Sequence, residues 1–244
     1  MPSRPTPLTI ALADGTSISG LLQTPTQAQA CYVFAHGAGA GMEHSFMAAM
    51  AQGLAERGIA TLRFNFPFME QGSKRPDSPA VAHAAIRAAV AEAAKRWADV
   101  PLFAGGKSFG GRMTTQAQAA QPLPGVRGIA LVGFPLHPAG KPSIERAAHL
   151  ADIELPLLFL QGTRDALADL DLIKQTTASL DKRATLHIVD GADHAFHVLV
   201  RSGRNDAQVR EELLDKLAAW MKKHRSGAGA RPQDHPQLRC NSLA

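Results

Sequence analysis

The sequence predicts a single α/β domain. Apolar runs rich in strand-forming residues alternate along the chain with alanine-rich runs that have helical periodicity. The chain has 244 residues, of which 45% are hydrophobic and 19% charged, as expected of a globular protein with a large core. After Arg225 the composition turns to small, polar and proline residues. We therefore expect one domain over residues 1–225 and a flexible C-terminal tail over residues 226–244.

Eight runs have the composition of β-strands. The first two are joined at Asp14-Gly15, a dipeptide that favours a hairpin turn. The third, residues 31–35, is apolar throughout, which indicates a strand buried on both faces. The predicted strands cover residues 8–11, 17–22, 31–35, 59–64, 102–104, 129–132, 157–160 and 185–189.

Five segments show helical periodicity. The first stops at Gly58, a residue that ends helices, and a loop is expected over residues 65–76. Only one short helix fits between Gly133 and Pro156, so we expect no large lid domain. The predicted helices cover residues 46–57, 78–97, 109–120, 167–180 and 206–223.

The net charge of +5 gives little support for binding to nucleic acid. Five basic residues and one acidic residue lie from Lys222 onward, which leaves 21 basic and 20 acidic residues in the rest of the chain. A nearly neutral body with a basic end indicates a solvated helix end and tail, and not a basic binding surface.

The two cysteines and the apolar runs point to a reduced, aqueous environment. Cys31 lies in a predicted buried strand and Cys240 in the polar tail, so we expect neither a disulfide nor a metal site. No apolar run approaches the length of a membrane span, and the N-terminus lacks the apolar core of a signal peptide. We expect a cytoplasmic protein that does not bind membranes.

A nucleophile is predicted at Ser108. The residues Gly-Lys-Ser-Phe-Gly at 106–110 match the pattern Gly-x-Ser-x-Gly, directly after a predicted strand and at the start of a predicted helix. This sharp strand-to-helix turn strains the serine backbone, and side chains at Gly106 or Gly110 would collide with the neighbouring strand and helix. The serine hydroxyl then lies at a helix N-terminus, where free N–H groups stabilise negative charge.

A phosphate-binding loop is the rival interpretation of the same residues. Gly106-Lys107-Ser108 also ends the pattern Gly-x-x-x-x-Gly-Lys-Ser, but that pattern needs glycine at position 101, where the chain has Pro101. We therefore reject nucleotide binding. Lys107 adjoins the nucleophile, but adjacent residues seldom face one another across such a turn, so we assign it no role as a base.

His194 is the predicted base, since serine needs a neighbouring group to take its proton. It follows the last predicted strand, which brings its imidazole to the carboxyl ends of the strands, where α/β sheets place their chemistry. His197 is the nearest competitor, and His187 alternates within the strand and is expected to be structural.

Asp165 is the predicted acid that orients the imidazole. It lies just past the predicted strand 157–160, and the order serine, aspartate, histidine is the one expected for such a site. Capping of a helix is the alternative role for Asp165. Asp169, Asp171 and Asp193 remain as other candidates for the acid.

Two backbone amides are predicted to form an oxyanion hole. The first belongs to Phe109, the residue after the nucleophile, and the second to Ala38 in the glycine-rich loop over residues 36–41. A dinucleotide-binding loop is excluded here, because Met42 occupies the position of the third glycine.

The chain resembles the α/β-hydrolase superfamily over nearly the whole predicted domain, and it is most similar to small, lidless members of the dienelactone hydrolase type. The resemblance implies a mostly parallel eight-stranded sheet flanked by helices, with no cofactor. Dienelactone hydrolases proper use a cysteine nucleophile where this chain has Ser108, so a carboxyl ester or related acyl compound is the expected substrate. The matching residues are those of four motifs in chain order: 36–37, 106–112, 162–165 and 191–194.

The sequence thus predicts a serine hydrolase that acts on a small-molecule acyl substrate. Phe66 and His137 follow strand ends and are predicted to line the substrate pocket, although core packing is the alternative for Phe66. The competing function is a catalytically silent interaction module on the same fold. Neither the oligomeric state nor the identity of the substrate can be read from the sequence.

Overall fold

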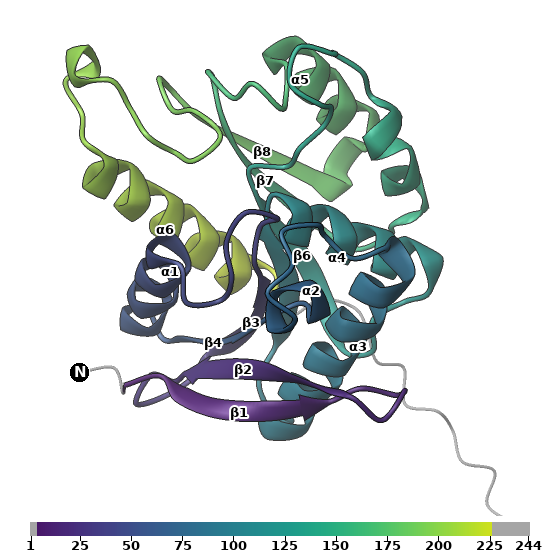
Figure 1. The fold of residues 1–244 in the computed structure, drawn as a ribbon. Helices are drawn as coiled ribbons and strands as arrows, with labels where there is room; N and C mark the ends of the chain where they lie inside the picture. The colour runs from purple at the N-terminus through teal and green to yellow at the C-terminus, as the bar shows by residue number, and fades with distance from the viewer. Residues whose placement is uncertain (1–3, 226–244) are drawn as a thin grey trace, which may run out of the picture.

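The computed structural model describes residues 4–225 and arranges them in three layers, with a β-sheet between two layers of helices (Figure 1). The predicted fold class is confirmed, because the sheet has eight strands and most of them run parallel. The predicted tail, residues 226–244, and Cys240 within it lie outside the described residues.

The sheet has the strand order β1-β2-β4-β3-β5-β6-β7-β8. β2 pairs antiparallel with both β1 and β4, and the remaining pairs are parallel. All parallel strands therefore end at the same edge of the sheet. The strands are β1 (Thr6–Ala11), β2 (Ser17–Gln23), β3 (Ala30–Ala35), β4 (Ile59–Phe64), β5 (Leu102–Lys107), β6 (Val126–Val132), β7 (Leu157–Gly162) and β8 (Ala184–Val189).

The helices cover the two faces of the sheet unequally (Figure 1). One face, which we call the cavity face, carries α1 (Ser45–Glu56) and α6 (Asp206–Lys223). The packed face carries α3 (Pro79–Arg96), α4 (Phe109–Ala120) and α5 (Leu170–Ser179). The short helical segments are α2 (Pro67–Glu70), η1 (Glu145–Asp152), η2 (Asp181–Arg183) and η3 (Val200–Ser202).

Each face of the sheet has its own apolar core, since alternate side chains of a strand point to opposite sides. Along β3, for example, Val33 belongs to the core of the packed face, whereas Tyr32 and Phe34 belong to that of the cavity face. Trp220 of α6 also belongs to the cavity-face core, where its ring packs on that of Phe103 in β5.

The observed elements differ from the predicted ones in several places, and three of these differences have a clear local form. β5 runs on to Lys107, so the strand leads straight into the serine turn. The expected loop 65–76 contains α2, which begins at Pro67, a residue favoured in a first helical turn. α5 begins three residues late because Asp169 caps it, accepting the N–H groups of Asp171 and Leu172.

Within residues 4–225, no large lid covers the carboxyl edge of the sheet. The segment between Gly133 and Pro156 holds only η1, as predicted. Among residues 4–225, no helix is long and apolar enough to cross a membrane.

Candidate active site

Ser108 lies between β5 and α4 in a strained backbone conformation. Its φ of 50° and ψ of −116° lie outside the regions that a serine normally adopts. The residue occupies the N-cap position of α4, next to the backbone N–H groups of the first helical turn. The conformation has the form that the Gly-x-Ser-x-Gly pattern predicts.

The two glycines of this pattern fit the predicted steric reason. A Cβ atom added to Gly106 would lie 2.5 Å from the Ala35 carbonyl oxygen, and one added to Gly110 would lie 2.5 Å from that of His36. Contacts this short have no room to relax, because their partner atoms are backbone. The sharp turn therefore depends on close approach between β5, the start of α4 and the end of β3.

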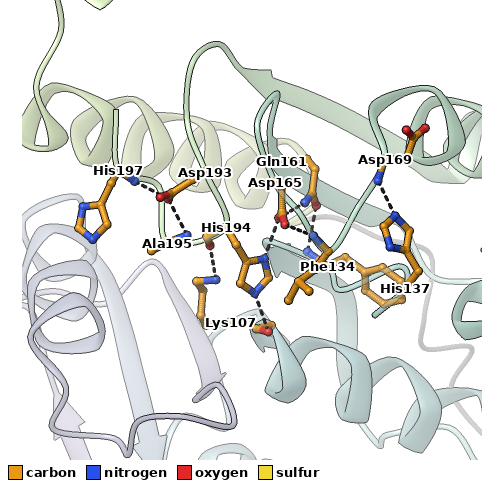
Figure 2. Close-up of polar contacts among 12 residues, drawn as sticks. Lys107, Phe134, His137, Gln161, Asp165, Asp169, Asp193, His194, Ala195 and His197 are labelled. Carbon is orange, nitrogen blue, oxygen red and sulfur yellow. Dashed lines mark hydrogen bonds and ion pairs between the residues drawn. The ribbon is translucent and has the colours of Figure 1, made fainter. Parts of the chain in front are cut away.

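The structure brings Ser108, His194 and Asp165 together. His194 Nε2 lies 2.8 Å from Ser108 Oγ, and His194 Nδ1 lies 2.7 Å from Asp165 Oδ2 (Figure 2). These distances suit an imidazole whose Nδ1–H donates to the carboxylate and whose Nε2 accepts from the hydroxyl. The three residues follow the carboxyl ends of β5, β7 and β8, and the fold brings these strand ends to one edge of the sheet.

The carboxylate of Asp165 is buried and fully engaged. Its Oδ1 accepts the Leu167 N–H at 2.8 Å, and its Oδ2 accepts a second hydrogen bond from Gln161 Nε2 (Figure 2). Gln161 is itself fixed, because its Oε1 accepts the Phe134 N–H at 3.0 Å. Since both oxygens have partners, the carboxylate is held in the orientation that faces His194.

Lys107, the residue before Ser108, reaches the loop of His194 from the opposite side to Asp165 (Figure 2). Its Nζ donates to the His194 carbonyl oxygen at 2.6 Å and lies 5.6 Å from the centre of the Phe196 ring. Burial lowers the pKa of Lys107 to about 8, although the carboxylates of Asp165 and Asp193 act in the other direction.

The loop after β3 is held beside the nucleophile by a buried histidine. His36 Nδ1 donates to the Gly37 carbonyl oxygen at 2.7 Å, and its Nε2 accepts the Phe66 N–H at 3.1 Å. Burial lowers the pKa of His36 to about 4, which keeps the ring neutral and able to accept. A Cβ at Gly37 would lie only 3.6 Å from Ser108 Cβ, so the backbone that leads to Ala38 passes next to the serine.

A cavity of about 740 Å³ opens beside Ser108 on the cavity face. Ala38, Ser108 and His194 lie in its wall together with largely apolar side chains from α1, α6 and the β8–α6 loop. Its lining residues are Gly37, Ala38, Gly39, Ala40, His44, Ser45, Phe46, Met47, Ala49, Lys107, Ser108, Leu167, His194, Ala195, Phe196, His197, Asp206, Arg210 and Leu213.

Phe66 and His137, which the sequence predicts in the pocket, lie elsewhere. Phe66 is fully buried in the core of the packed face, where it packs on His36 and Phe109. His137 is buried as well, and its Nε2 accepts the Asp169 N–H at 2.8 Å, next to the start of α5. Neither lines the cavity, because both lie toward the face opposite to it, and we withdraw both assignments.

The competing histidines have other partners. His197 Nδ1 lies 2.6 Å from Asp206 Oδ2, and His187 Nε2 lies 2.7 Å from Glu212 Oε1. Neither is hydrogen-bonded to Ser108 or Asp165.

The competing aspartates also have structural partners. Asp193 accepts the N–H groups of Ala195 and His197, and Asp169 caps α5 as described above. Asp171 lies in the first turn of α5, 3.8 Å from the Lys174 ammonium. In the part of the chain that the structure describes, no group of three or more His, Cys, Asp or Glu side chains is arranged to hold a metal ion.

Sequence reasoning missed Gln161, Lys107 and most of the cavity wall. A polar residue at the end of the apolar strand 157–162 was a usable signal for Gln161, because a buried amide needs a partner. The walls contributed by Phe46, Met47 and Leu213 carried no such signal, since apolar positions on a helix predict core packing.

A family model described as an alpha/beta hydrolase domain matches residues 28–222. The chain belongs to the alpha/beta hydrolase domain family. The match spans the whole sheet beyond the first hairpin and includes all three residues of the Ser108, His194 and Asp165 cluster. The resemblance that the four motifs indicated is therefore confirmed at the level of the family.

Solved structures share the fold of this α/β hydrolase at low sequence identity. A dienelactone hydrolase from Anabaena variabilis is 18% identical with a TM-score of 0.72, over 91% of this chain and 98% of that one. An alpha-beta serine hydrolase homologue from Coxiella burnetii is 21% identical with a TM-score of 0.70, over 87% and 97%. A Xanthomonas campestris protein described as an a/b serine hydrolase without lid is 20% identical with a TM-score of 0.69, over 95% and 99%.

Proposed function

We propose that this α/β hydrolase is a serine hydrolase that cleaves a small carboxyl ester, or a related acyl compound, through an acyl-enzyme on Ser108. The observation that carries the proposal is the continuous hydrogen-bonded chain from Ser108 Oγ through His194 to Asp165 Oδ2, at the strained turn after β5. Membership of the family supports hydrolysis, and the chain of hydrogen bonds supports a serine nucleophile.

The reaction follows from the positions of the protons. Ser108 Oγ attacks the carbonyl carbon of the ester while His194 Nε2 takes the hydroxyl proton. The imidazolium that forms donates from Nδ1 to the buried carboxylate of Asp165, which stabilises it. His194 then gives its proton to the leaving alkoxide, and the acyl group remains on Ser108. A water molecule, deprotonated by His194, attacks the acyl-enzyme, releases the carboxylic acid and restores the serine hydroxyl.

The negative oxygen of the tetrahedral intermediate needs two donors. We assign these to the amides of Phe109 and Ala38. Phe109 begins α4, where a backbone N–H has no acceptor within the helix, and Ala38 lies in the cavity wall beside Ser108. The dipole of α4 adds to this stabilisation, since its positive end points at the same oxygen.

The cavity favours substrates with an apolar acyl group. Phe46, Met47, Phe196 and Leu213 give it apolar walls, and about 740 Å³ is room for an acyl chain of several carbons. Ser108 and His194 lie in the cavity wall, so the reacting carbonyl would be bound next to them. We therefore expect activity toward simple esters with a short to medium acyl chain.

Labelling with a fluorophosphonate tests the proposal. The probe should modify wild-type protein at Ser108 and leave the Ser108→Ala variant unlabelled, with both proteins showing the same circular dichroism. A graded series of p-nitrophenyl acyl esters should be hydrolysed by the wild type and not by the variant. Folded wild-type protein that neither reacts with the probe nor exceeds the variant on any ester would favour a catalytically silent module.

A further inference from the structure

The proposed mechanism gives no role to one partly buried charged group in the cavity wall, the ammonium of Lys107. Lys107 is the last residue of β5 and the immediate neighbour of Ser108. Its side chain runs to the cavity face, where Nζ donates to the His194 carbonyl oxygen at 2.6 Å. His194 is thus hydrogen-bonded at its backbone oxygen to Lys107 and at its ring Nε2 to Ser108, two consecutive residues.

This double attachment restricts how the base can move. The backbone hydrogen bond fixes the start of the β8–α6 loop relative to β5, and the ring hydrogen bond fixes the imidazole relative to the nucleophile. If the loop moves away from β5 and carries the His194 ring away from Ser108, the hydrogen bond from Lys107 Nζ to the His194 carbonyl oxygen must break. Positioning of this kind accelerates a reaction because a displacement of about 1 Å costs roughly 100-fold in rate.

The residue directly after β6 leaves space for the side chains of Lys107 and His194. Gly133 has a φ of +68°, and a Cβ atom there would lie 3.0 Å from Lys107 Nζ and 3.5 Å from His194 Cε1. The ammonium and the imidazole therefore pack against one backbone position directly after a third strand, β6. The ammonium also lies over the face of Phe196, another residue of the His194 loop.

The Lys107 ammonium lowers the free energy of unfolding compared with an apolar side chain of similar length at the same position. Within residues 4–225 no carboxylate oxygen comes within 4 Å of Nζ, so its charge is balanced only by carboxylates farther away, those of Asp165 and Asp193. Burying a charge without a paired ion is unfavourable. A methionine would fill the same space and remove the cost, which indicates that the charge serves the site.

We propose that Lys107 is a positioning residue whose ammonium holds the His194 loop against the nucleophile, and that this hold depends on its positive charge. The inference rests on the proposed serine hydrolase function. A charge-assisted hydrogen bond to a carbonyl oxygen is roughly twice as strong as a neutral one, so loss of the proton weakens the attachment without removing it.

A dependence on pH follows. Since burial lowers the pKa of Lys107 to about 8, the ammonium loses its proton as the pH rises through that value, and turnover should decline on the alkaline side. The charged and titratable groups around it are Asp165, Asp193 and His194, and those farther along the cavity wall are His44, His197, Asp206 and Arg210.

The experiment compares wild type, Lys107→Met, Lys107→Arg and the control Lys174→Met, whose lysine is half-exposed on α5. For each, kcat and KM on one p-nitrophenyl ester are measured from pH 6 to pH 10, after circular dichroism has shown the same fold. We expect Lys107→Met to lower kcat roughly 10- to 100-fold with little change in KM, and to lose the alkaline decline. Lys107→Arg should move the decline to higher pH, because a guanidinium keeps its charge. Lys174→Met should match the wild type.

The inference is overturned if Lys107→Met keeps the wild-type kcat and the same pH profile, or if Lys107→Arg declines at the same pH as the wild type. Should Lys107→Met fail to fold, the profile of Lys107→Arg decides. Ser108→Ala separates this inference from the proposed function. If Ser108→Ala keeps the wild-type activity, the proposed serine hydrolase function is wrong. If Ser108→Ala loses activity while the Lys107 variants match the wild type, only the proposed role of Lys107 is wrong.

Discussion

The two faces of the sheet use the same strands differently. On the packed face, the aromatic rings of Phe64, Phe66, Phe68 and Phe109 contact one another beside the nucleophile turn and fill the space. On the cavity face, the same strand ends leave about 740 Å³ between the nucleophile, α1 and α6. The edge of the sheet thus sets where the reactive groups meet, whereas the helices and loops beyond it set which face is open to a substrate.

Substitutions at the shared edge should have the largest effect, since neither face compensates for them. Asp165→Asn keeps the size of the side chain but removes the negative charge that orients and stabilises His194. We expect kcat to fall on the order of 10⁴-fold, and the free energy of unfolding to fall by about 1–3 kcal/mol, because the amide nitrogen of asparagine cannot accept a hydrogen bond as the carboxylate does. Steady-state hydrolysis of a p-nitrophenyl ester and urea denaturation measure the two quantities.

Asp169→Asn is the matched control for that substitution. Asp169 was an alternative candidate for the acid, and asparagine caps helices as well as aspartate does. The variant should keep both activity and stability. Loss of activity in Asp169→Asn, with Asp165→Asn active, would mean that the acid has been assigned wrongly.

A substitution on the packed face should affect stability and leave selectivity alone. Phe66 is fully buried among four aromatic rings, so Phe66→Ala creates a cavity there, and we expect a loss of about 4 kcal/mol in the free energy of unfolding. Urea denaturation measures the loss. If the variant instead unfolds like the wild type while its preference among acyl chains shifts, Phe66 would belong to the pocket after all.

The location of the site at the edge of the sheet could be predicted from the sequence. The Gly-x-Ser-x-Gly pattern marks the turn in the sequence, because Gly106 and Gly110 are needed where the end of β3 lies against them. His194 and Asp165 could be placed because each follows a strand, and parallel strands end at one edge. Their convergence with Ser108 therefore follows from topology.

The choice of face could not be predicted, and the error at Phe66 and His137 shows why. A residue just past a strand end no longer follows the alternation that assigns side chains to faces, because the loop is free to turn either way. Phe46 and Leu213 lie in helices that the sequence predicted well, but their orientation toward a cavity depends on how α1 and α6 pack across the sheet. That packing is set by contacts distant in the sequence.

Acid should weaken the packed face through His36. Its pKa is about 4 in the folded protein against an ordinary value of 6.5, so below pH 6.5 the unfolded chain takes up a proton that the folded protein does not. The free energy of unfolding should therefore be highest above pH 6.5 and fall by roughly 3 kcal/mol from this group as the pH drops to 4. Urea denaturation at a series of pH values measures the slope.

His36→Gln separates this contribution from that of the other groups. Glutamine keeps a donor and an acceptor but does not titrate, so the variant should be less stable at pH 7 and lose less stability between pH 6.5 and pH 4. His149, whose pKa burial also lowers to about 4, remains to give part of the decline. A variant with the full wild-type slope would show that His36 is not the buried neutral group described above.

The smallest effect is expected on the cavity face, where Phe46 stacks on Phe196 with ring centres 6.2 Å apart. Phe46 is only partly buried, so Phe46→Ala should cost the fold about 1 kcal/mol, well below the cost at Phe66. Removing the ring lengthens the space available to an acyl chain, and we expect the ratio of kcat/KM for the octanoyl ester over the butyryl ester to rise about 10-fold. Phe66→Leu, a milder change on the packed face, is the control and should leave this ratio unchanged. If both variants shift the ratio equally, selectivity is not set by the walls of the cavity face, and the difference between the two faces would concern packing alone.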